Sequence, residues 1–155
     1  MELTKEMKEA MIVSLLRHDA TPSGVECSFF QFGTVGIKFY GYTDFAKNAA
    51  RNAFAQQVRC YAKGLAPKPG VVFSIPIKGA GNDGSPIFLH GYTTEVAVMV
   101  EGIDDDERRT MRMLLDAAGL PAGDLHSRNV GYVVDEATNT FKLVPIDFGY
   151  HFNPY

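Results

Sequence analysis

The sequence has no tryptophan, only two cysteines and no apolar stretch long enough to span a membrane. A membrane-spanning helix needs about 20 consecutive apolar residues, and charged residues interrupt the N-terminal segment MELTKEMKEAMIVSLLRHD. We therefore expect neither a signal peptide nor a membrane span. Cys27 and Cys60 are too few for the disulfide framework of a small secreted domain, which favours reduced thiols and a cytoplasmic location.

An excess of positive charge is also missing. The 155 residues carry a formal net charge of -3, and the isoelectric point is near 5.8. This balance argues against a surface that coats nucleic acid, although it leaves room for a local basic pocket. A chain of this length buries about two-thirds of the surface of its unfolded state, so one domain or two small lobes can fold without a metal or a disulfide.

The apolar pattern predicts three helices alternating with three hairpins. Helical spacing of apolar residues, or the absence of glycine and proline, predicts helices at residues 3–16, 44–63 and 105–118. Apolar runs separated by turn residues predict strand pairs at 27–32 and 35–40, 71–77 and 87–97, and 130–134 and 142–146. This order predicts an α+β fold.

Helix-end signals support these assignments. Asp44 is the expected N-cap of the second helix, and Gly64 is its expected C-terminal stop. Asp104 and Glu107 have the spacing of a capping box for the third helix, which Gly119 ends. The expected apolar stripe of the third helix consists of Met111, Leu114, Leu115 and Ala118.

Three short segments are typical of phosphoryl transfer. Val35–Lys38 reads VGIK, Gly123–Asn129 reads GDLHSRN, and Ile146–Gly149 reads IDFG. In this order they resemble the catalytic core of the protein-kinase-like superfamily. The form GDLHxxN is more similar to aminoglycoside and choline kinases than to the His-Arg-Asp of eukaryotic protein kinases.

The resemblance covers roughly residues 25–150 and implies a bilobal kinase-like fold. It predicts one kinase-like domain over residues 1–155. Residues 1–97 would form an N-lobe-like part with a helix, a sheet and a second helix. Residues 98–155 would form a minimal C-lobe with one main helix, the catalytic loop and the Asp-Phe-Gly hairpin.

The resemblance also implies a role for each polar residue of these segments. Asp124 would orient the acceptor hydroxyl and take its proton, and Asn129 and Asp147 would hold Mg²⁺. Lys38 would hold the phosphates of ATP. His126 lies in the same loop, where it would contact the acceptor or hydrogen-bond to the backbone. The expected function is ATP- and Mg²⁺-dependent transfer of the γ-phosphate to a hydroxyl.

Three further positions are implied for the nucleotide. No G-x-G-x-x-G loop is present, so the turn at Gly33 is expected to cover the phosphates. Gln57 stands where the family has a helix glutamate that pairs with the strand lysine, and its amide could hydrogen-bond to an ammonium. Glu95–Ala97 resembles the hinge that binds adenine through backbone groups.

Two departures keep a second class of function open. Gln57 is neutral, and the chain ends eight residues after Asp147, without the activation segment and helices that form the acceptor platform of a kinase. A pseudokinase-like binding module that docks on a partner is therefore the alternative. The apolar residues of the helix at 105–118 would then be exposed, and we expect a homodimer or a protein partner to cover them.

Two weaker alternatives also fit part of the sequence. A metal-dependent hydrolase would use Asp124, His126 and Asp147, but this reading explains neither Lys38 nor the long segment before residue 100. The loop residues could also be two ordinary turns capped by Asx side chains. The compact length suggests a phage or another mobile element, in which case the protein would act in the host cytoplasm.

Overall fold

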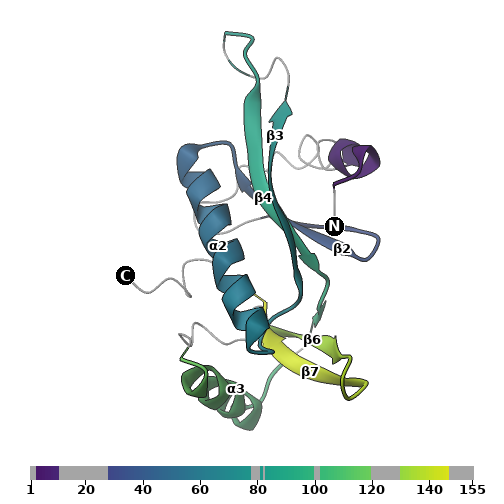
Figure 1. The fold of residues 1–155 in the computed structure, drawn as a ribbon, viewed down its shortest axis with the longest axis vertical. Helices are drawn as coiled ribbons and strands as arrows, with labels where there is room; N and C mark the ends of the chain where they lie inside the picture. The colour runs from purple at the N-terminus through teal and green to yellow at the C-terminus, as the bar shows by residue number, and fades with distance from the viewer. Residues whose placement is uncertain are drawn as a thin grey trace. The chain divides into compact units, whose positions relative to one another are not determined.

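The computed structural model describes residues 3–10, 28–77, 81, 83–99, 102–119 and 130–146. Within them, residues 5–10 are helical. The further elements are β1 (Ser28–Phe32), β2 (Val35–Gly41), α2 (Asp44–Ala62), β3 (Pro69–Ile77), β4 (Ile87–Glu95), β5 (Val98–Met99), α3 (Asp105–Ala117), β6 (Val130–Asp135) and β7 (Thr140–Pro145) (Figure 1). The fold is α+β, as the sequence predicts. None of the described helices is long and apolar enough to cross a membrane.

The strands form two sheets. The four-stranded sheet has the order β1-β2-β4-β3, and the three-stranded sheet has the order β5-β6-β7. All three predicted hairpins are confirmed as neighbouring strands, with ends that differ by a few residues. The expected strand at 87–97 ends two residues earlier, at Glu95, and the short strand β5 that follows belongs to the other sheet.

Contacts within the chain define two compact units. The first unit consists of Met1–Asn52 and Gly70–Glu95, and the second of Ala53–Pro69 and Val96–Tyr155. The first therefore contains the four-stranded sheet and the start of α2. The second contains the end of α2, the helix α3 and the three-stranded sheet. The predicted lobe boundary after residue 97 stays a prediction.

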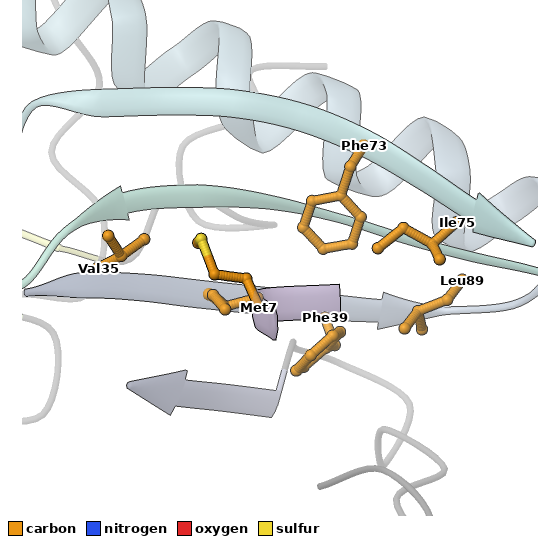
Figure 2. Close-up of a cluster of buried hydrophobic side chains, with 7 residues drawn as sticks. Met7, Val35, Phe39, Phe73, Ile75 and Leu89 are labelled. Atoms are coloured by element: carbon orange, nitrogen blue, oxygen red, sulfur yellow. The ribbon is translucent and has the colours of Figure 1, made fainter. Parts of the chain in front are cut away.

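The core of the first unit lies on one face of the four-stranded sheet. Because side chains alternate along a strand, Val35, Ile37 and Phe39 of β2 all point to this face. The rings of Phe39 and Phe73 meet edge to face, with centroids 6.1 Å apart. The complete cluster is Met7, Val35, Ile37, Phe39, Phe73, Ile75 and Leu89, with Met7 contributed by the N-terminal helical residues (Figure 2).

The core of the second unit is apolar and includes one buried thiol. It consists of Cys60, Leu65, Ala66, Met111, Leu115 and Val130. Helix α3 contributes Met111 and Leu115, which lie one turn apart. Leu114 of the predicted stripe lies outside this cluster and is 50% exposed, consistent with the expectation that the helix exposes apolar residues. Leu114 and Leu115 point about 100° apart on a helix, and this narrow cluster buries only the side that carries Leu115.

The N-terminus of α2 differs from the prediction. Thr43 caps the helix, because its hydroxyl accepts a hydrogen bond from the N–H of Ala46 at 3.0 Å. Asp44, the predicted cap, is instead the first helical residue, where its carboxylate complements the helix dipole. Threonine and aspartate are both good N-caps, so the sequence alone does not show whether Thr43 or Asp44 caps the helix.

The predicted end of α2 and the predicted start of α3 are confirmed, while the end of the helix predicted at 3–16 lies outside the described residues. Gly64 has φ +74°, and the N–H of the next residue, Leu65, donates to the carbonyl of Cys60, which is a Schellman ending for α2. At the start of α3, Asp104 accepts from the N–H of Glu107 at 2.8 Å. The Glu107 carboxylate accepts in turn from the N–H of Asp104 at 3.3 Å, which completes the capping box.

Candidate functional site

The predicted site residues divide into two groups. Asp124, His126, Asn129 and Asp147 lie outside the described residues. Gly33, Lys38, Gln57, Glu95 and Ala97 are described. The part of the predicted site that the structure describes is therefore centred on Lys38.

Lys38 lies on the face of the four-stranded sheet opposite to the apolar core. Lys38 pairs with Tyr92 in the β2–β4 register, so the two side chains share a face. We call this surface the lysine face. From alternation, register and the contacts described below, its members are Phe29, Gly36, Lys38, Tyr40, Ser74, His90, Tyr92 and Thr94.

The ammonium of Lys38 is buried against aromatic rings. The residue is only 8% exposed, and its Nζ lies 5.5 Å from the centroid of the fully buried Tyr92 ring. Tyr92 stacks in turn on Tyr40, with centroids 6.1 Å apart and planes inclined by 21°. Lysine is almost never buried without a partner, and the negative face of an aromatic ring offsets part of the cost of removing the cation from water.

Gly36 creates space on the lysine face that an aromatic ring fills. A Cβ atom at position 36 would lie 2.8 Å from Cε2 of Phe29 and 3.2 Å from Cγ2 of Thr94. The Phe29 ring therefore packs directly on the Gly36 backbone, while 54% of the residue stays exposed. Phe29 cannot be placed from the sequence alone, because it shares the face of Lys38 only through the β1–β2 register.

His90 and Ser74 form a hydrogen-bonded pair on the same face. Nδ1 of His90 lies 2.8 Å from the Ser74 hydroxyl. Burial lowers the pKa of His90, and the positive charge of Lys47 on α2 lowers it further. Both effects favour the neutral imidazole. Sequence spacing does not reveal this pair, because Ser74 is on β3 and His90 is on β4.

Gln57 is fully buried in the second unit. Its amide nitrogen donates a hydrogen bond to the carbonyl oxygen of Pro67 at 2.9 Å, which ties α2 to the segment that follows it. An ammonium would need the amide oxygen instead. The role of Gln57 toward Lys38 stays a prediction.

The remaining described positions have ordinary structural surroundings. Gly33 has φ +61° in the β1–β2 turn, and its carbonyl accepts from the side chain of Gln31 at 3.0 Å. Glu95 is exposed at the end of β4, and the division between the two units falls directly after it. Ala97 is half-buried and packs on the backbone of Gly131.

The described residues alone do not assemble a metal site. Among them, no group of three or more His, Cys, Asp and Glu side chains could hold a metal ion. The predicted ligands Asn129 and Asp147 are not among these residues. The thiol of Cys60 is buried in the core. Burial raises its pKa to about 11, which disfavours the reactive thiolate.

Comparison of the chain with protein-family models, with curated proteins and with solved structures finds no match. The kinase resemblance therefore depends on the sequence motifs.

Proposed function

We propose that this chain binds ATP and Mg²⁺ through a kinase-like domain and transfers the γ-phosphate to a hydroxyl acceptor. Lys38 holds the phosphates, Asn129 and Asp147 hold the metal, and Asp124 takes the acceptor proton. His126 contacts the acceptor or the backbone of its own loop. Mg²⁺ would supply charge stabilisation of the transferred phosphoryl group.

The observation that carries the proposal is the burial of Lys38. A strand lysine usually extends into water, yet this one is 8% exposed at the centre of a sheet and is held over Tyr92. A fixed, partly desolvated point charge is what a nucleotide phosphate requires, and Lys38 ends the VGIK segment that resembles the phosphate-binding strand of kinases.

The register of the β6–β7 hairpin supports the metal assignment. Val130 pairs with Pro145 at one end of this hairpin. In the sequence, Asn129 directly precedes Val130, and Asp147 follows Pro145 by two residues. A shared Mg²⁺ needs ligands from both segments, and the pairing of Val130 with Pro145 favours their approach.

Exposed apolar side chains favour the second candidate function, a pseudokinase-like module that docks on a partner. Met113 and Leu114 of α3 are 64% and 50% exposed. Gln57 is neutral at the position where a catalytic kinase would have a carboxylate. In this function the nucleotide is retained or lost, and a second copy of the chain or another protein covers α3.

The first test is thermal unfolding of the purified chain with ATP, with and without Mg²⁺. A ligand at 100 times its Kd stabilises the folded state by about 2.7 kcal/mol, which raises Tm by several degrees. The shift should require Mg²⁺ and should vanish in Lys38→Met and in Asp147→Ala. Lys63→Met, which removes an exposed lysine, is the matched control.

The two functions give different results in the same assay. For the kinase function, Asp124→Ala should keep the ATP-dependent shift and lose phosphate transfer to added hydroxyl acceptors. A shift without any transfer, unaffected by Asp124→Ala, would favour the binding module. The absence of a shift with ATP would contradict the ATP-dependent proposal.

A further inference from the structure

The Phe29 ring occupies an unusual place on the lysine face. It lies on the Gly36 backbone, where a Cβ atom would be 2.8 Å from Cε2 of the ring and 3.2 Å from the methyl group of Thr94. One side of the ring is thus held by the sheet. Because 54% of the residue remains exposed, part of the ring is accessible to a planar ligand.

The ring and the lysine are close neighbours with different chemistry. Phe29 pairs with Lys38 in the β1–β2 register. Gly36, on which the ring lies, is two residues from Lys38 on the same face, a separation of about 7 Å along the strand. The Lys38 ammonium lies on the other side of β2 from Phe29, over Tyr92 of β4. An aromatic platform and a buried cation therefore lie side by side on one rigid sheet.

We propose that Phe29 is the base-recognition residue of the nucleotide site, with the nucleobase stacked on the exposed side of its ring. This inference rests on the proposed function and names the part of the ligand that Phe29 binds. Stacking on an aromatic ring accepts every base, because each base has a flat π-face. The site should therefore accept GTP and CTP as well as ATP, with the phosphates directed to Lys38.

Calorimetric titration with two probes separates the base from the phosphates. The full chain is titrated with Mg²⁺-ATP and with Mg²⁺-tripolyphosphate, which has the phosphates and no base. Phe29→Leu keeps the apolar volume and should weaken ATP binding about 5- to 150-fold, the equivalent of roughly 1–3 kcal/mol for a lost base stack. Tripolyphosphate binding should not change, and Phe29→Tyr should restore ATP binding.

Matched variants identify the cause of any loss. Phe141→Leu removes a ring that is 66% exposed on the other sheet, and it should leave both titrations unchanged. Lys38→Met should weaken both probes. A second measurement needs no variant: the NMR signal of the Thr94 methyl group, which like the Phe29 ring lies close to the Cβ position of Gly36, should shift with ATP and not with tripolyphosphate.

Each contrary outcome has a distinct meaning. If Phe29→Leu binds ATP as tightly as the unaltered chain, or weakens both probes equally, Phe29 only fills the space at Gly36 and the inference is overturned. The proposed function would stand in that case, provided that Lys38→Met weakens binding. If the unaltered chain binds neither probe, the proposed function is contradicted and the inference is overturned with it.

Discussion

The two sheets bury their faces differently. In the four-stranded sheet, β4 is buried from Leu89 to Thr94, so both faces of this central strand are covered. Its lysine face encloses Lys38, His90 and Thr94. In the three-stranded sheet, one face leaves three apolar side chains largely exposed, namely Val98, Val134 and Phe141.

The two sheets therefore present different kinds of surface, one with buried polar groups and one with exposed apolar groups. A polar group that is removed from water destabilises the fold unless it has a hydrogen-bond partner, and no buried side-chain nitrogen or oxygen in the described residues lacks one. The first unit therefore holds fixed polar groups at the centre of a sheet, as a ligand site requires. The three-stranded sheet instead leaves apolar side chains exposed on one face, as a docking surface requires.

The largest expected effect concerns the core of the second unit. Leu115→Ala should lower the free energy of unfolding by about 2–5 kcal/mol, because the fully buried side chain leaves a cavity. Leu114→Ala, one residue earlier and 50% exposed, should change it by less than about 0.5 kcal/mol. Urea unfolding of both variants measures the contrast. Equal losses would mean that α3 buries a wider stripe.

The next effect concerns the close pairing of β2 and β4. A Cβ atom at Gly91 would overlap the backbone carbonyl oxygen of Lys38 and would lie 2.7 Å from Cζ of Phe73. Gly91→Ala should therefore destabilise the chain by about 1–3 kcal/mol. Gly102→Ala is the control, because nothing lies within 4 Å of its Cβ position. A tolerated Gly91→Ala would show that the central strands are less tightly paired.

The sequence predicted the local elements better than the site. Strands, helices, the Asp104–Glu107 capping box and the Gly64 stop follow from signals within a few residues. The pairing of β2 with β4 and the position of Phe29 on Gly36 depend on register between segments that are far apart in the sequence. Local sequence signals do not reveal which residues of distant strands pair with each other. Apolar spacing along α3 also included Leu114 in the stripe, and only the narrow extent of the buried cluster shows that Leu114 lies outside it.

A smaller effect tests the cap of α2, the helix shared by both units. Thr43→Ala removes the hydroxyl that accepts from Ala46 and should cost about 1 kcal/mol. Asp44→Ala should cost less than Thr43→Ala, since Asp44 contributes only a first-turn charge. Chemical denaturation of the two variants in low salt compares them. A larger loss of stability in Asp44→Ala than in Thr43→Ala would identify Asp44 as the cap.

The smallest effect is the pH dependence of the first unit. The pKa of His90 is lowered in the folded state, first by burial and then by Lys47, with Arg51 adding to the decrease and Asp44 opposing it. The unfolded state therefore binds more protons, and stability should fall as the pH decreases below about 6.5. His90→Gln should reduce this dependence between pH 7 and 5.5, as measured by urea midpoints. An unchanged dependence of the urea midpoint on pH in His90→Gln would contradict the lowered pKa of His90.

The strand order also has a consequence for how the chain folds. The β1–β2 hairpin can close locally, but Val35 must find Glu95 after α2 and β3 have intervened. Such a long loop is slow to close. The chain loses conformational entropy when the loop closes, before the strand pairs that would stabilise it have formed. Lys38 meets Tyr92 only in this last pairing. Nascent chains without β4 therefore lack the lysine face, and a ligand bound there would select molecules that have completed their sheet.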